Sequence, residues 1–88
     1  MGSMSVSRKV WAIHYGAKQQ PDGSWLHDDG DVYWFNDEGD VHRADGPAII
    51  RNGHMYWSLN DREYSLEDWL KRTPISDEDK MMLRLQYG

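Results

Sequence analysis

The dipeptide Asn52-Gly53 lies between two runs of strand-forming residues, 48–51 and 54–59, and it constrains the fold more than any other feature. A two-residue type I′ turn needs positive φ at both central positions, which asparagine and glycine adopt at low cost. The sequence therefore predicts a β-hairpin centred on this dipeptide. Three further turn signals precede it, in segments 16–23, 28–30 and 37–39. Turn signals at such short intervals favour an antiparallel meander.

Strand-forming residues fill the intervals between these turns. The first of these segments alternates loosely around Val10, Ala12 and Ile13 and is interpreted as a strand. Pro47 has no N–H to donate to a ladder, so we expect it at the start of a strand. The expected strands are 7–15, 24–27, 31–36, 40–43, 47–51 and 54–59.

A helical period replaces the strand pattern after Asn60. Ser65 followed by acidic residues is typical of a helix N-cap and predicts a helix over 66–72. Ser76 is again followed by acidic residues and opens a second helix. We therefore expect two short C-terminal helices.

The expected fold class is α+β, in a single domain over residues 4–88. An antiparallel β-meander of about five to six short strands occupies residues 8–60, and a helical cap occupies residues 65–88. A chain of 88 residues is too short to divide into two independent cores. Residues 1–3, before Met4, are interpreted as a vector-derived scar.

Aromatic side chains supply much of the expected core, with five tryptophans and five tyrosines in the chain. Successive side chains of a strand point to opposite faces, so one member of each Tyr-Trp pair should face away from the core. Trp34 and Trp57 are therefore expected to be exposed anchors for a partner, unless the helices or a second copy of the chain in a homodimer cover them.

Negative charge is concentrated in residues 19–45, which carry eight acids against Arg43 alone, whereas the whole chain has a net charge of −5. This distribution argues against direct binding to nucleic acid and favours a partner with a basic surface. The acids expected to contact that partner are Asp28, Asp29, Asp31, Asp37, Glu38 and Asp40.

The segment His-Arg-Ala-Asp-Gly at 42–46 admits two interpretations. As a ligand site, Arg43 could hold a carboxylate or phosphate while His42 and Asp45 transfer protons, with Arg51 nearby on the next strand. As a structural element, Asp45 would cap its own turn and Arg43 would brace a neighbouring group. The second interpretation explains every residue of the segment and is the favoured one.

Residue patterns for catalysis, metal and cofactor binding are missing from the sequence. It holds no cysteine, no nucleophile in a recognisable setting and no glycine-rich phosphate loop. Its four histidines lack metal-ligand spacing, and no apolar run is long enough to cross a membrane. We therefore expect a non-enzymatic protein without cofactor, metal or membrane segment.

The run His42-Arg43-Ala44-Asp45-Gly46-Pro47-Ala48 resembles the H-R-x-D-G-P-A repeat of small tailed-bacteriophage proteins, which are distantly similar to MORN-type β-hairpin repeats. The resemblance covers roughly residues 31–60. It implies a phage accessory protein that acts in the host cytoplasm on a host factor, and it implies no catalytic residue. At 61–63 this chain departs from the pattern, so the array is expected to end there.

Three functions follow as hypotheses. The first is binding and modulation or inhibition of a host bacterial protein, through an acidic surface that mimics DNA charge. The second is sequestration of a nucleotide signal, stacked on Trp34 or Trp57 with Arg43 or Arg51 on its phosphate. The third is a structural role in the virion.

Overall fold

A computed structural model describes residues 7–88, so the interpretation of residues 1–3 as a scar lies outside the described part. Six strands form one antiparallel sheet in the order β1-β2-β3-β4-β5-β6, which confirms the expected meander and the α+β class. The strands are β1 (Lys18–Gln19), β2 (Trp25–Leu26), β3 (Val32–Tyr33), β4 (Ile49–Arg51), β5 (His54–Leu59) and β6 (Arg62–Tyr64). The helices are α1 (Arg8–His14), α2 (Leu66–Arg72) and α3 (Asp77–Tyr87).

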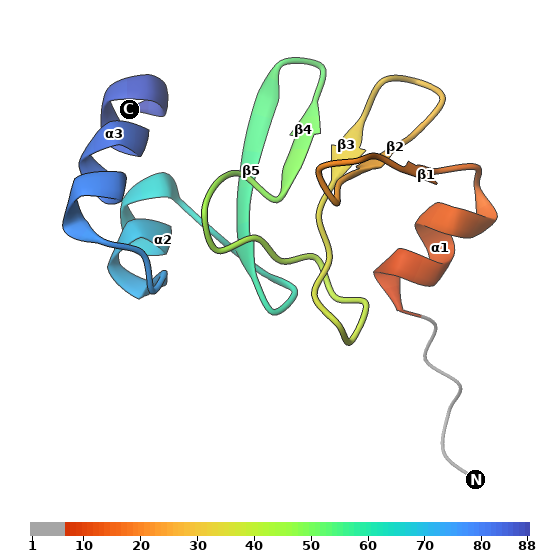
Figure 1. Ribbon diagram of the computed structural model, residues 1–88, viewed down its shortest axis with the longest axis horizontal. Helices are drawn as coiled ribbons and strands as arrows, with labels where there is room; N and C mark the ends of the chain where they lie inside the picture. The colour runs from red at the N-terminus through yellow and green to blue at the C-terminus, as the bar shows by residue number, and fades with distance from the viewer. Residues whose placement is uncertain (1–6) are drawn as a thin grey trace, which may run out of the picture.

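The molecule is elongated, 43 × 32 × 21 Å, with helices at both ends of the sheet. Figure 1 shows α1 beside the β1–β3 end, and α2 with α3 beyond β5 at the other end. Because most strands have only two or three residues, the sheet by itself buries little surface. Packing against the helices is therefore needed to complete the core.

The hairpin at Asn52-Gly53 forms as expected and joins β4 to β5. Both turn residues have positive φ, 51° and 79°. A second two-residue turn with positive φ, 51° at Asn60 and 68° at Asp61, connects β5 to β6. The meander thus extends to Tyr64 and does not end at residue 60 as expected, because Asn60-Asp61 makes a turn although it is not an Asn-Gly pair. The end of the repeat array at 61–63 stays a prediction.

The segment expected to be the first strand is helix α1 instead. Ser7 caps it by accepting a hydrogen bond from the backbone N–H of Val10 at 3.2 Å. Trp11 and Tyr15, four residues apart, stack with ring centroids 5.3 Å apart. That spacing puts both rings on one helix face, so the apolar positions fit a helical period as well as a strand.

Residues 40–43 form one isolated bridge, Phe35 to Val41, where the sequence predicted a strand. The side chain of Asn36 accepts hydrogen bonds from the N–H groups of Glu38 and Asp40, both at 3.0 Å, and turns the chain. Strand β3 pairs with β4 instead, through Tyr33 to Ile49. The intervening residues form a long connection across the end of the sheet.

The hydrophobic core lies between β5 and the C-terminal helices. Trp57 and Trp69 pack with ring centroids 4.7 Å apart, next to Leu70. Ser65 and Ser76 cap α2 and α3 as expected from the sequence. Most of the fold's buried aromatic surface is therefore held by one strand and two helices.

We expect Trp69→Ala to lower the free energy of unfolding by about 3–5 kcal/mol, since Trp69 is fully buried. That is a large share of the roughly 5–15 kcal/mol available to a domain of this kind. Met82→Ala, at an exposed position on α3, is the control and should change the value by less than about 0.5 kcal/mol. Urea denaturation measures both, and similar losses in the two variants would contradict this core assignment.

The two C-terminal helices are also linked by Arg84, which donates hydrogen bonds of 3.0 and 2.8 Å to the carboxylate of Glu67. These bonds lower the pKa of Glu67 below the 4.5 of an unperturbed glutamate. A lowered carboxyl pKa in the folded state stabilises above pH 4.5, and this contribution is lost as the pH falls through the folded-state pKa.

In Arg84→Gln, we expect the pKa of Glu67 to rise toward 4.5. A carboxyl-detected NMR titration measures this shift. Arg62→Gln, an exposed substitution on β6, should leave the Glu67 midpoint in place. An unchanged midpoint in Arg84→Gln would show that the helix-to-helix pair does not form in solution.

Candidate functional site

The His-Arg-Ala-Asp-Gly segment makes internal contacts throughout. Nδ1 of His42 accepts a hydrogen bond from the backbone N–H of Asn60 at 3.0 Å. The guanidinium of Arg43 stacks on the Trp34 ring, 4.2 Å from its centroid, and donates to Asp45 at 2.9 Å. It also donates to the carbonyl of Pro47 at 3.2 Å. These contacts support the structural interpretation of the segment.

The backbone of the same segment holds α2 against the sheet. Nε1 of Trp69 donates to the carbonyl of Arg43 at 3.2 Å, and the hydroxyl of Thr73 donates to the carbonyl of Ala44. A Cβ on Gly46 would come within 2.7 Å of the Arg43 guanidinium, so a side chain there would displace the arginine. The segment therefore works as a joint between the sheet and the helical cap.

The two tryptophans expected at a partner surface are covered by other parts of the chain. Trp57 is only 5% exposed and belongs to the core, so it is not an exposed anchor. The C-terminal helices cover it, and the sequence-based expectation of exposure had named such cover as its exception. Trp34 is half-buried, with the Arg43 guanidinium over its ring. Neither ring offers the open stacking platform that the nucleotide hypothesis assigned to it.

The acidic residues do not form one continuous face. Asp28 and Asp29 lie on the β2–β3 turn, and Asp37 and Glu38 lie on the turn that follows Phe35. Figure 1 shows these turns at opposite ends of the strands. The side chain of Asp31 is only 10% exposed and is paired inside the protein, so it is not available to a partner.

Helix α1 extends between the two acidic turns. Near its start, the N–H of Lys9 donates to the carbonyl of Gly39 at 3.0 Å. Just after its end, Gly16 lies beside Asp28, where an added Cβ would be 3.4 Å from a carboxylate oxygen. Val10 and Ile13 on α1 are about half exposed, at 53% and 46%. We call this combination the α1 surface, which comprises Val10, Ile13, Asp28, Asp29, Asp37, Glu38 and Asp40.

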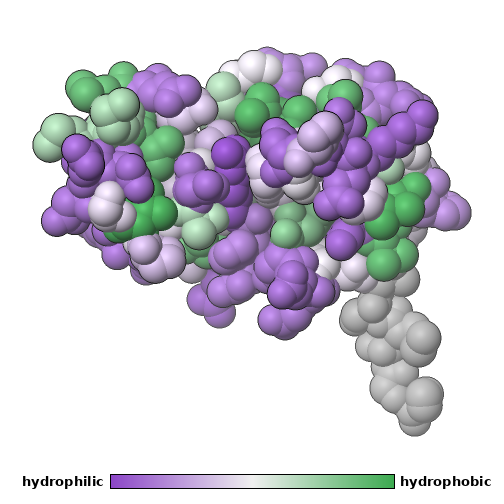
Figure 2. Space-filling model, viewed as in Figure 1, coloured by the Kyte–Doolittle hydropathy of each residue, from purple (hydrophilic) through white to green (hydrophobic). Residues whose placement is uncertain are grey.

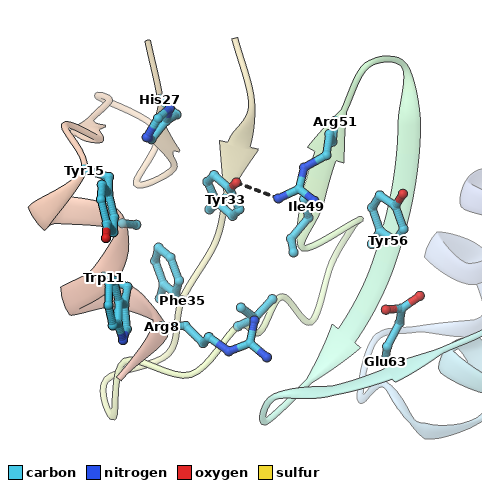
Figure 3. Close-up of a pocket in the computed structure, with 12 residues that line it drawn as sticks. Arg8, Trp11, Tyr15, His27, Tyr33, Phe35, Ile49, Arg51, Tyr56 and Glu63 are labelled. Atoms are coloured by element: carbon cyan, nitrogen blue, oxygen red, sulfur yellow. Dashed lines mark hydrogen bonds between the residues drawn. The ribbon is translucent and has the colours of Figure 1, made fainter. Parts of the chain in front are cut away.

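The face of α1 that carries Trp11 and Tyr15 borders a hollow of about 620 Å³ above the sheet. Five aromatic side chains line it, together with Arg8, Arg51 and His27. Figure 3 shows Trp11 and Tyr15 projecting from the helix on one side, and Tyr33, Phe35 and Tyr56 on the sheet side. We call this hollow the aromatic groove, whose lining is Arg8, Trp11, Ala12, Tyr15, His27, Tyr33, Phe35, Val41, Ile49, Arg51, Tyr56 and Glu63.

A hydrogen-bonded cluster fixes one side of the aromatic groove. Arg51 donates through Nε to Asp31 at 3.0 Å and through Nη2 to the hydroxyl of Tyr33 at 2.8 Å. The hydrogen bond to Tyr33 and the pairing with Asp31 raise the pKa of Arg51 above its ordinary value, so the guanidinium stays charged. Asp31 thus orients Arg51 within the groove.

Nδ1 of His27 also lies at this end of the groove. It is 3.3 Å from a carboxylate oxygen of Asp29 but makes no hydrogen bond among the described residues. The backbone N–H of Asp31 donates to Asp29 at 3.1 Å and is the main cause of the lowered pKa of that carboxyl. His27 is thus a polar contact of the groove that the sequence did not single out.

The sequence contains signals for the groove that appear only when residues 8–15 are taken as a helix. Residues 8, 11, 12 and 15 share one helix face, and residues 33 and 35 share one strand face. Of the proposed ligand residues, only Arg51 reaches the groove, whereas Arg43 and Asp45 pair with each other and His42 bonds to Asn60.

A comparison with known proteins gave no match to a family model, to a curated protein or to a solved structure. The resemblance to phage repeat proteins therefore remains a prediction from residues 31–60. Among residues 7–88, no group of three or more potential metal-ligating side chains converges, and no helix is long and apolar enough to span a membrane.

The pairing of Arg51 with Asp31 can be tested by a double-mutant cycle. Arg51→Gln should lower the free energy of unfolding by about 1–2 kcal/mol, because it leaves a buried carboxylate without its cation while the arginine itself is half exposed. Asp31→Asn should cost less, and the double variant should cost less than the sum of the two. Urea denaturation of the four proteins measures the coupling, and strictly additive losses would contradict the pairing.

Proposed function

We propose that this chain is a non-enzymatic phage accessory protein that binds a host protein and thereby modulates or inhibits it. The observation that carries the proposal is the α1 surface, in which exposed apolar residues lie between two acidic turns. Apolar side chains framed by polar ones are the usual composition of a protein interface. The phage origin rests on the resemblance of residues 42–48 to the phage repeat.

The charges of the α1 surface favour a particular kind of partner. Asp28 near one end of α1 and Asp37 with Glu38 near the other are exposed to solvent. Both turns lie within reach of one partner surface, and their charges act over about 8–10 Å at physiological salt. The complementary partner carries an apolar patch with basic residues on either side of it, as a protein that binds nucleic acid often does.

Binding fits the site better than catalysis does. His42 and Asp45 are the residues to which the sequence analysis assigned proton transfer. His42 accepts a hydrogen bond from a backbone amide and Asp45 accepts one from an arginine of the same chain. Arg43 is stacked on Trp34 and only its edge meets solvent. The α1 surface remains, and its exposed apolar and acidic side chains suit binding to another protein.

The proposal can be tested by capturing host proteins from a bacterial lysate on the immobilised chain, with quantitative mass spectrometry. The test variant is Asp28→Asn/Asp37→Asn/Glu38→Gln, and the matched control is Asp77→Asn/Glu78→Gln/Asp79→Asn on α3, where all three positions are again exposed. We expect a specific host protein whose recovery falls about tenfold in the test variant, since three rim charges together contribute about 1.5 kcal/mol.

Recovery of the same host protein should also fall when the salt concentration rises from about 50 to 300 mM, because screening weakens exposed charge pairs. The control variant should retain it at the wild-type level. If no host protein is enriched over a blank matrix, or if both triple variants recover it equally, the α1 surface is not the contact.

A further inference from the structure

The aromatic groove is separate in chemistry from the α1 surface, because its lining combines rings with guanidinium groups while its acidic content is limited to Glu63. We propose that it is a binding site for a planar anion of nucleotide chemistry, in which a ring stacks on the groove's aromatic side chains and a phosphate meets Arg8 or Arg51. This inference goes beyond the binding of a host protein and rests on different residues.

The dimensions of the groove suit a small molecule. Its volume of about 620 Å³ falls within the range of roughly 300–1,000 Å³ that is typical of small-ligand sites. On the face of the molecule shown in Figure 2, hydrophobic side chains gather in separate places among hydrophilic ones. A hollow of this size with a few polar groups on its edge is the usual form of a ligand site.

Two pairs of rings border the groove from different elements. Trp11 and Tyr15 of α1 stack nearly parallel, with an angle of 8° between their planes. Tyr33 and Phe35 of the β3 segment stack at 13°, with centroids 6.1 Å apart. Figure 3 shows the first pair on α1 and the second pair on the neighbouring β3 segment. Each pair presents ring surface on which a nucleobase can stack without any requirement for sequence-specific hydrogen bonds.

Two guanidinium groups supply the positive charge. Arg51 uses Nε and Nη2 in its bonds to Asp31 and Tyr33, and among residues 7–88 its Nη1 group makes no hydrogen bond. The side chain of Arg8 is 65% exposed and reaches Asp61 only at 3.9 Å, so it can turn toward an incoming anion. Arg51 is thus a fixed donor and Arg8 a movable one, and guanidinium groups bind phosphate well.

The net charge of −5 opposes the approach of an anion, and the strength of this repulsion decides whether the groove can bind one. The exposed acids of the two turns act through water and are screened beyond about 8–10 Å at physiological salt. A phosphate in contact with a guanidinium is screened much less, since it lies within one contact distance. The distant repulsion is therefore weak at physiological salt, and the electrostatic balance at the site is set by Arg51 and Arg8 against the nearby Asp31, Asp61 and Glu63.

Isothermal titration calorimetry and tryptophan fluorescence of the full chain can test the proposal. The probes are the four ribonucleoside 5′-monophosphates and the 3′,5′-cyclic purine monophosphates at up to millimolar concentration. Adenosine supplies a ring without charge, and pyrophosphate supplies charge without a ring. We expect saturable binding of at least one nucleotide, with affinity at least tenfold above those of adenosine and pyrophosphate. No saturation by any nucleotide, or equal binding of adenosine, would overturn the proposal.

Two pairs of variants locate the site. Trp11→Ala should weaken binding about tenfold or more, as expected for loss of a stacking ring, whereas Met82→Ala should not. Arg8→Gln should weaken it about fivefold, whereas Arg62→Gln, an exposed arginine outside the groove lining, should leave it unchanged. Equal affinities within both pairs would place any bound nucleotide elsewhere.

Trp11→Phe separates the fluorescence signal from the affinity, because it keeps a ring and removes the one indole of the groove lining, while the other four tryptophans remain. We expect the fluorescence change to shrink while the calorimetric affinity stays within about threefold. The triple variant Asp28→Asn/Asp37→Asn/Glu38→Gln should bind the nucleotide at least as well as the wild type. Nucleotide binding and host-protein binding can therefore fail independently of each other, and a loss of nucleotide binding in this triple variant would contradict the separation of the two sites.

Discussion

The fold depends on two backbone carbonyls, those of Arg43 and Ala44, which accept hydrogen bonds from Trp69 and Thr73 of the first C-terminal helical region. With sequence separations of 26 and 29 residues, these hydrogen bonds join the helical cap to the 42–48 segment. Because Trp69 also packs on Trp57, the same side chain completes the core and anchors the connection. A buried indole needs a partner for its N–H, and the loop carbonyl provides one.

This constraint explains why the surfaces proposed for binding lie at the far end of the molecule. The His-Arg-Ala-Asp-Gly segment is occupied by its own contacts, and β5 is covered by α2 and α3. Within residues 7–88, helix α1 has no comparable partner across its outer face, where Val10 and Ile13 remain about half exposed. The α1 surface and the aromatic groove thus lie on two faces of one helix, and a different ligand is proposed for each.

Local signals predicted the C-terminal half of the chain well. Serine caps at Ser65 and Ser76 define both helices, and Asn52-Gly53 defines a hairpin, because each depends on a few adjacent residues. The errors arose where tertiary packing decided between two periods, as in residues 8–14, or where a turn used an uncommon pair such as Asn60-Asp61. The groove could not be predicted, because it forms only where helix α1 lies beside the strands, and no local sequence pattern indicates that position.

The central claim is that the segment 42–48 builds the structure while binding belongs to the α1 end. Arg43→Gln tests it most directly, with stability and binding measured on the same protein. We expect a loss of about 1–3 kcal/mol in the free energy of unfolding, from the lost hydrogen bonds and the stacking on Trp34. Recovery of the host protein and nucleotide affinity should stay within about twofold of the wild type. Unchanged stability together with lost binding would contradict the account and return the segment to its interpretation as a ligand site.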